Sequence, residues 1–203
     1  LAVQRAQPGE PIVPTLRMLM GGGGPKPPEL FFEVKREMGV RIVHGYGMTE
    51  SPMISNGTPS DTDEQLAYTD GKPVRGCEVR IVRDDGSAAP PGVEGAIQVR
   101  GPMLFRGYLD PAQTAEAMTD DGWFVTGDLG VLREDGHLSV TGRTKDVIIR
   151  KGENVGAQEV ETVLYEHPSV GAVAVIGLPD PERGERVCAV VELVAGAPAI
   201  TLA

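Results

Sequence analysis

Glycine and proline recur along the whole sequence, and they constrain its fold more than any other feature. The 203 residues include 27 glycines and 17 prolines, which fall between periodic apolar segments rather than in one low-complexity tract. Both residue types favour turns and end regular elements. The sequence therefore predicts many short helices and strands joined by tight turns.

Near the amino end, the pattern predicts a strand–helix–strand unit. Residues 16–20 form a short apolar run that ends at Gly21–Gly24, and residues 29–38, which follow a proline, have helical spacing. The predicted helix carries apolar residues four positions apart on one face: Leu30, Val34 and Met38. Residues 40–43 form a second apolar run that leads into a glycine-rich loop at Gly45–Gly47. Because ligands of open α/β sheets lie beyond the carboxyl ends of the strands, both glycine-rich loops are candidates to line one crevice.

From Gly71 onward, the sequence predicts a β-rich region. Short apolar runs have the length and alternation of strands at residues 77–82, 95–100, 129–132 and 138–141. Acidic residues followed by glycine make the intervening turns, Asp84-Asp85-Gly86 and Glu134-Asp135-Gly136. A short helix is expected at 111–118, with Asp110 as its N-cap.

After Arg143 the pattern becomes that of a small α+β domain. A strand is expected at residues 147–149, a helix at 157–167 and two more strands at 171–176 and 187–194. The predicted helix places three residues on one apolar face: Val160, Val163 and Leu164. Since a polar stretch lies at 144–146, we expect two domains, residues 1–145 and 146–203. The predicted fold class is mixed α/β and β-rich, followed by the start of a small α+β domain.

The composition argues against some function classes. The formal net charge of −10 repels phosphate backbones and argues against nucleic acid as a partner. No apolar run approaches the ~20 residues that a transmembrane helix needs, and no signal peptide is visible. Cys77 and Cys188 lie far apart in apolar runs, which favours small buried side chains in a reducing compartment. We therefore expect a cytoplasmic protein without a transmembrane segment.

The hexapeptide Gly45-Tyr46-Gly47-Met48-Thr49-Glu50 combines groups that suit a nucleotide. Tyr46, between glycines, presents a flat face on which a purine can stack. The Thr49 hydroxyl can bond a phosphate oxygen, and Glu50 supplies a hard carboxylate for Mg²⁺. The alternative interpretation is a structural turn. The hexapeptide resembles the adenine and metal motif of the adenylate-forming superfamily, which includes acyl-CoA synthetases.

Two further segments resemble motifs of the same superfamily on either side of the hexapeptide. Gly22-Gly23-Gly24-Pro25 is similar to its Gly-Gly-Ala-Pro loop, with Gly24 in place of the usual Ala. Asp128 ends a Thr-Gly-Asp motif, and the resemblance implies that its carboxylate accepts hydrogen bonds from the ribose hydroxyls. Taken singly, these segments also fit a glycine-rich turn and an ordinary loop aspartate.

Residues 142–154 resemble the hinge motif of the superfamily over its whole length. The resemblance implies that Arg143 contacts the ribose or a phosphate and that the small domain swings about Lys145. It also implies that Lys151-Gly152-Glu153 forms a loop used for thioester formation with coenzyme A. A basic, solvated strand end is the alternative. The motifs occur in the superfamily's order, which favours the resemblance over four separate coincidences.

By this resemblance, the chain is part of an ATP-dependent acyl-CoA synthetase that activates a carboxylic acid, with a fatty acid favoured. The implied small-molecule partners are the acid, ATP/AMP, Mg²⁺ and coenzyme A. The implied catalytic residues are Thr49, Glu50 and Lys145, with Glu50 also the metal ligand. The implied nucleotide-binding residues are Gly22, Gly23, Gly24, Pro25, Tyr46, Gly47, Met48, Thr49, Asp128 and Arg143.

Two superfamily segments are missing from the sequence. One is a Ser/Thr/Gly-rich loop with a lysine that grips the ATP phosphates, and the other is a Pro-Lys-x-x-x-Gly-Lys stretch that supplies the adenylation lysine. We therefore expect a fragment of a longer ligase that is inactive by itself. An adenylation domain that loads a carrier protein and a non-catalytic module stay open as alternatives. The identity of the acid, the oligomeric state and a contact of His44 with the acyl pocket also stay open.

Overall fold

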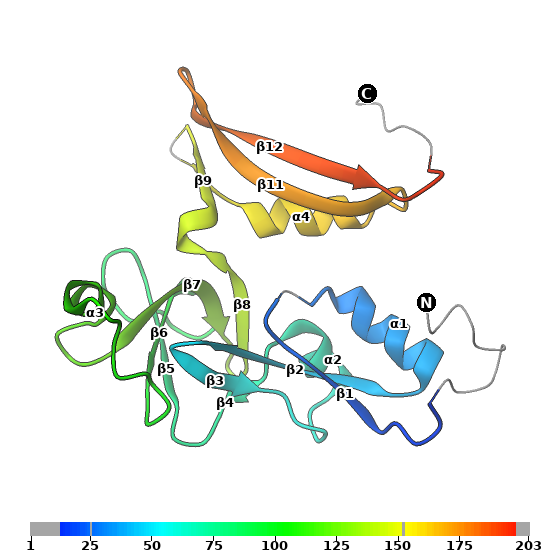
Figure 1. Cartoon of the computed structure of the whole chain (residues 1–203), viewed down its shortest axis with the longest axis horizontal. Coiled ribbons are helices and arrows are strands. Elements are labelled where there is room, and N and C mark those ends of the chain that lie inside the picture. The colour runs from blue at the N-terminus through cyan, green and yellow to red at the C-terminus, as the bar shows by residue number, and fades with distance from the viewer. Residues whose placement is uncertain (1–12, 25, 152, 198–203) are drawn as a thin grey trace. The chain divides into compact units, whose positions relative to one another are not determined.

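The computed structural model describes residues 13–24, 26–151 and 153–197. The chain divides into two compact units. Unit 1 comprises residues 1–126 and 130–140, and unit 2 comprises residues 127–129 and 141–203. Within the described residues, the strands form three four-stranded sheets (Figure 1). No helix in this part of the chain has the length and hydropathy needed to cross a bilayer.

The first sheet begins with the predicted strand–helix–strand unit. Strands β1 (Met18–Gly21) and β2 (Arg41–Met48) are parallel and are joined by helix α1 (Pro28–Met38), which has proline in its first turn. The sheet continues in the order β1-β2-β3-β4 with β3 (Ser51–Asn56) and β4 (Lys72–Pro73). The expected loop at Gly45–Gly47 is wrong, because β2 runs through these residues and pairs with β3.

Helix α1 packs through Val34, as predicted, but through Phe31 rather than the predicted Leu30. Phe31 is fully buried, whereas Leu30 is 44% exposed. Phe31 and Val34, three positions apart, pack on strand β2 and on helix α2 (Asp63–Tyr68). The sequence supplies adjacent apolar residues at 30 and 31, and contact with the sheet selects Phe31. The core here is formed by Phe31, Ile42, Val43, Leu66 and Ala67.

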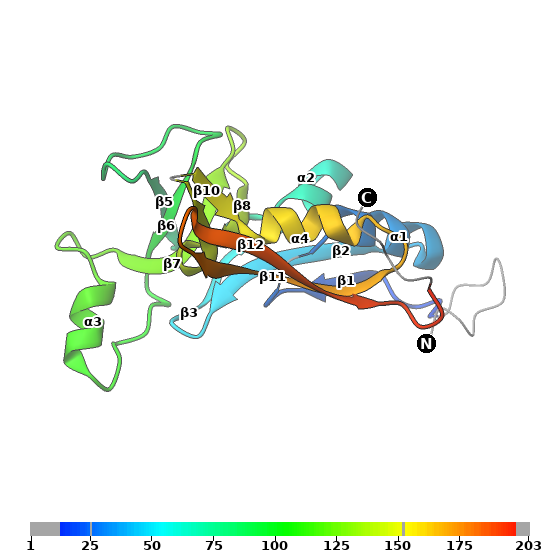
Figure 2. The same cartoon turned by 90° about the horizontal axis from the view of Figure 1, so that it is seen from above.

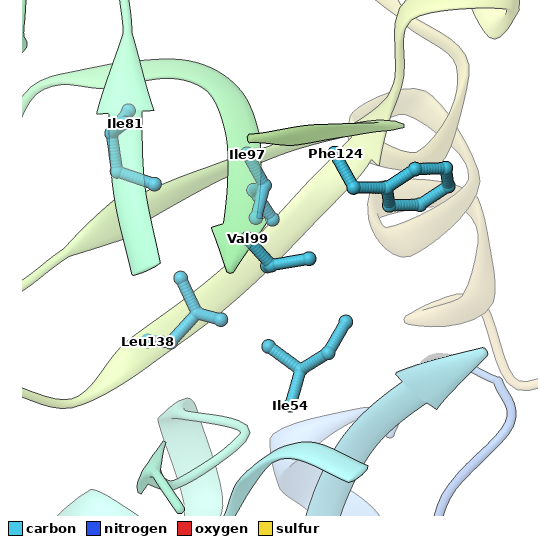
Figure 3. Close-up of a cluster of buried hydrophobic side chains, with 6 residues drawn as sticks. All are labelled: Ile54, Ile81, Ile97, Val99, Phe124 and Leu138. Carbon is cyan, nitrogen blue, oxygen red and sulfur yellow. The ribbon is translucent and has the colours of Figure 1, made fainter. Parts of the chain in front are cut away.

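The second sheet confirms the predicted β-rich region. Its order is β5-β6-β7-β8, formed by β5 (Glu78–Val82), β6 (Glu94–Arg100), β7 (Phe124–Leu132) and β8 (Leu138–Arg143). Helix α3 (Pro111–Ala117) precedes β7, and the Asp110 side chain accepts a hydrogen bond from Ala112 N, as expected for its N-cap. A core of six buried side chains links this sheet to β3: Ile54, Ile81, Ile97, Val99, Phe124 and Leu138 (Figure 3).

Unit 2 contains the predicted α+β elements. After a 3₁₀ turn, η2 (Thr144–Asp146), come β9 (Val147–Arg150), β10 (Glu153–Gly156), α4 (Ala157–Tyr165), β11 (Val170–Asp180) and β12 (Gly184–Leu193). The sheet order is β10-β9-β12-β11, and α4 runs along it (Figure 2). Val160 and Leu164 pack into the core as predicted. Val163 does not, because this residue is 62% exposed.

Candidate functional site

The two glycine-rich segments lie side by side in unit 1. Strands β1 and β2 pair in parallel with Gly21 opposite His44. A Cβ atom on Gly22 would lie 3.0 Å from the Gly45 carbonyl oxygen, so the backbone approach leaves almost no room for a side chain. The structure therefore brings the predicted Gly22–Gly24 segment next to the hexapeptide. The predicted Pro25 lies outside the described residues.

Two contacts anchor this glycine-rich region to its neighbours. Lys26 Nζ donates to the Ala67 carbonyl oxygen at 2.5 Å, and burial lowers the pKa of this lysine while the Asp70 charge opposes that effect. His44 is buried, and its Nδ1 lies 2.8 Å from Asp70 Oδ1. Asp70 Oδ2 in turn accepts the Val140 backbone N–H at 2.8 Å. The Asp70 carboxylate therefore ties β2 to β8.

The hexapeptide forms the end of β2 and the turn into β3. The register shifts between Tyr46 and Met48. At this point, a Cβ on Gly47 would lie 2.3 Å from the Pro52 carbonyl oxygen, so only glycine fits. Tyr46 and Met48 are partly buried against the Ile54 core, while Thr49 is exposed in the turn.

Glu50 completes this turn and is held by a distant loop. The Tyr108 hydroxyl donates to Glu50 Oε1 at 2.8 Å, and the Phe105 backbone N–H donates to the Glu50 carbonyl oxygen at 2.7 Å. The hydrogen bond to the Glu50 carboxylate raises the pKa of Tyr108, as does partial burial. Glu50 is therefore located through both its backbone and its side chain.

Asp128 and Arg143 meet in unit 2. Arg143 Nε donates to Asp128 Oδ1 at 3.0 Å, which joins two residues that the sequence predicted for one nucleotide. Asp128 is only 4% exposed, whereas the Arg143 side chain is 65% exposed. The next residue, Thr144, donates from its hydroxyl to the Gly127 carbonyl oxygen at 2.9 Å. The pair thus offers a buried carboxylate beside a solvent-facing guanidinium.

The remaining predicted residues of unit 2 follow the 3₁₀ turn. Lys145 is exposed on η2. Lys151 has a left-handed φ of 52° in the connection between β9 and β10, where Glu153 pairs with Arg150. Lys151 N donates to the Arg183 carbonyl oxygen at 2.8 Å, which ties this connection to the turn between β11 and β12. The predicted Gly152 lies outside the described residues.

Two segments of the sequence match models of known protein families. Residues 3–109 match the model of the AMP-binding enzyme family, and residues 159–203 match that of the AMP-binding enzyme C-terminal domain. The chain belongs to the AMP-binding enzyme family. The predicted resemblance to the adenylate-forming superfamily is thereby confirmed.

Relatives of the chain include ligases named for different acids. The chain is 37% identical over 194 residues to the medium-chain fatty-acid–CoA ligase of Escherichia coli, and the aligned region covers 95% of this chain and 34% of that ligase. It is 41% identical over 197 residues to the salicyl-AMP ligase / salicyl-S-ArCP synthetase of Mycobacterium tuberculosis, and that aligned region covers 96% of this chain and 34% of the relative. The chain thus spans about a third of the length of the curated relatives it matches.

A solved relative supports the arrangement of the elements. The structure of ATP-bound MatB from Rhodopseudomonas palustris is 34% identical and covers 90% of this chain and 36% of MatB, with a TM-score of 0.85. The likeness therefore extends over nine-tenths of the chain.

Sequence reasoning missed Tyr108 and Asp70 as supports of the candidate site. Tyr108 lies 58 positions from Glu50, and Asp70 lies 26 positions from His44. Neither residue carries a motif or a periodic signal that would link it to its partner. Only the folded chain shows which residues hold the predicted ones.

Proposed function

We propose that this chain contributes to an ATP-dependent acid–CoA ligase, longer than 203 residues, of the AMP-binding enzyme family. Residues 1–145 would belong to its large adenylate-forming domain and residues 146–203 to the start of its small domain. The relatives' greater length supports a longer parent protein, and their names support the reaction. The observation that carries the proposal is the Asp128–Arg143 pair, because it combines a ribose acceptor with a cation for phosphate.

The reaction follows from the chemistry of the carboxylate. A carboxylate oxygen attacks the α-phosphorus of ATP, the bond to the bridging oxygen breaks, and pyrophosphate leaves. The acid becomes a mixed anhydride with AMP. The thiol of coenzyme A loses its proton to the surroundings and its sulfur attacks the acyl carbon. The bond between that carbon and the AMP oxygen breaks, and AMP leaves as the thioester forms.

The predicted site residues have different roles in this proposal. Tyr46 stacks on the adenine, and the Thr49 hydroxyl donates to a phosphate oxygen. Asp128 accepts from the ribose hydroxyls while Arg143 faces the ribose or a phosphate. Lys145 serves as the hinge. The connection at 151–153 then approaches the adenylate for the second step.

Glu50 fits a magnesium ion that is shared with phosphates. Within the described ranges, no three His, Cys, Asp or Glu side chains are grouped to hold a metal by themselves. Mg²⁺ commonly binds through one or two carboxylates together with substrate phosphates and water. Glu50 supplies one carboxylate, and its Oε2 has no hydrogen-bond partner among the described residues. When bound, Mg²⁺ would neutralise phosphate charge.

The names of the relatives support a choice of acid and of acceptor to test first. We propose a fatty acid as the first substrate class to test, since one relative is named for medium-chain fatty acids. Loading of a carrier protein is the second candidate, because another relative is named as a salicyl-S-ArCP synthetase. We also propose a cytoplasmic location, since Cys77 and Cys188 are free thiols.

The test is acid-dependent ATP–pyrophosphate exchange by the full-length parent enzyme with a panel of fatty and aryl acids. Exchange followed by coenzyme A-dependent thioester formation supports the ligase. Thioester formation only on an acyl carrier protein supports the second candidate. Absence of exchange with every acid contradicts both. The 203-residue chain alone is expected to show neither half-reaction.

A further inference from the structure

A single loop holds Glu50 at two points. The loop comprises residues 105–108, and it reaches the turn between β2 and β3. Its Phe105 N–H donates to the Glu50 carbonyl oxygen at 2.7 Å, and its Tyr108 hydroxyl donates to Glu50 Oε1 at 2.8 Å. Because one contact fixes the backbone and the other fixes the carboxylate, the loop determines where the charge of Glu50 lies.

Tyr108 is itself fixed by its surroundings. Its ring packs edge-on against Phe105 with centroids 4.7 Å apart, and Phe105 packs against the buried Phe124 at 5.4 Å. The Tyr108 backbone N–H donates to Thr114 Oγ1 at 2.8 Å. Gly107 has a φ of 134°, and a Cβ there would lie 2.9 Å from the same Thr114 oxygen. The position of the Tyr108 hydroxyl is therefore set by the packing of its ring on Phe105 and of Phe105 on Phe124.

The chemistry of this donor suits a carboxylate that must keep its charge. A lysine or arginine partner would neutralise Glu50, whereas a neutral phenol satisfies one oxygen and leaves the negative charge for a cation. Tyr108 occupies Oε1, and Oε2 has no hydrogen-bond partner in the described part of the chain. Hydrogen bonds of this kind orient carboxylates that act on metals, and their loss typically costs 10–100-fold in affinity or activity.

We propose that Tyr108 is a positioning residue that orients the Glu50 carboxylate and presents Oε2 to the magnesium–phosphate group of ATP. The inference rests on the proposed function. It assigns Tyr108 no contact with the nucleotide and no part in bond making, so its effect passes through Glu50. A loop that only closes the turn between β2 and β3 is the competing explanation.

The variants Tyr108→Phe and Tyr68→Phe of the full-length enzyme separate these explanations. Tyr108→Phe removes the hydroxyl and keeps the ring against Phe105. Tyr68 is an exposed tyrosine of α2, so its variant is a matched control. Calorimetric binding of MgATP in the absence of acid gives a readout that is independent of turnover. Exchange rates measured against free Mg²⁺ give the second readout.

For Tyr108→Phe we expect MgATP affinity 10–100-fold weaker than in the wild type and a matching rise in the Mg²⁺ concentration for half-maximal exchange. Tyr68→Phe should change neither quantity. In a Glu50→Ala background, adding Tyr108→Phe should have no further effect, because the group it positions is gone.

Three outcomes would overturn the inference. The first is a wild-type MgATP affinity in Tyr108→Phe, and the second is an equal loss of affinity in the two tyrosine variants. The third is a further loss on adding Tyr108→Phe to Glu50→Ala, which would show that Tyr108 does not act through Glu50. If the wild type itself shows no acid-dependent exchange, the proposed function fails first, so the two failures are distinguishable.

Discussion

Replacing Gly47 with alanine tests how closely strands β2 and β3 approach at the candidate site. The new Cβ would lie 2.3 Å from the Pro52 carbonyl oxygen and 2.7 Å from the Pro52 carbonyl carbon. Cβ atoms essentially never approach other atoms within 3.0 Å, so the strands must separate by about 0.7 Å or more. The atoms that must move are backbone atoms, which cannot rotate away as a flexible side chain could.

Overpacking of this kind typically costs about 1–3 kcal/mol, and occasionally more. For a chain of this size, each kcal/mol lowers Tm by about 2–4 °C, so a loss of roughly 2–12 °C is expected. Trp123 is the sole tryptophan and belongs to unit 1, as Gly47 does, so its fluorescence reports unfolding of the relevant unit. The 203-residue chain suffices for this measurement.

Gly24→Ala is the matched control in the neighbouring glycine-rich segment. A Cβ at Gly24 would meet nothing within 4 Å, and Gly24 is not among the glycines with positive φ. Alanine there should leave Tm unchanged or raise stability by about 0.4–1 kcal/mol, because it restricts the unfolded chain. Equal Tm values for Gly47→Ala and Gly24→Ala would refute the close approach of β2 and β3.

Three other predictions concern different parts of the chain. Thr62→Ala removes the capping box of α2 and should cost about 1 kcal/mol in urea unfolding; an unchanged midpoint would contradict the cap. Hydrogen bonds from Arg80 and Thr119 lower the pKa of Asp121 to about 2, so its stabilising contribution is present above about pH 4 and is lost as the pH falls toward 2. Asp121→Asn should flatten the stability profile in that window, and an unchanged slope there would argue against the Arg80–Asp121 pair. Lys145→Pro in the full-length enzyme should impair one half-reaction more than the other, and equal loss would weaken the hinge assignment.

The sequence predicted elements whose ends carry their own chemical signals. Pro28 lies in the first turn of α1, and Asp110 caps α3. These signals are local, because one residue beside the helix end is enough to predict where the helix begins. Strands of the β-rich region were also predicted, because turns of acidic residues and glycine separate them.

Features that depend on distant contacts were not predictable. The glycines of the hexapeptide indicate a loop when read alone, but Gly45 and Gly47 are needed for close approach of strands within a sheet. Strand β3 buries Ser51 and Ser55 and exposes Met53, and strand β10 has only four residues, so alternation did not reveal either strand. The choice of Phe31 over Leu30 depends on where the sheet lies. The Tyr108–Glu50 bond depends on the folding of a remote loop.

We propose that Asp128 binds the ribose of the nucleotide in an acid-activating enzyme. The most direct measurement is the ATP affinity of the full-length Asp128→Ala variant, compared with Asp85→Ala, which changes an exposed turn acid. A hydrogen bond to a charged group contributes about 1.5–3 kcal/mol, so the loss of Asp128 should make the ATP affinity roughly 10–150-fold weaker. The Asp128→Ala enzyme should stay folded, and Asp85→Ala should keep the wild-type ATP affinity. Wild-type ATP affinity in a folded Asp128→Ala enzyme would contradict the claim.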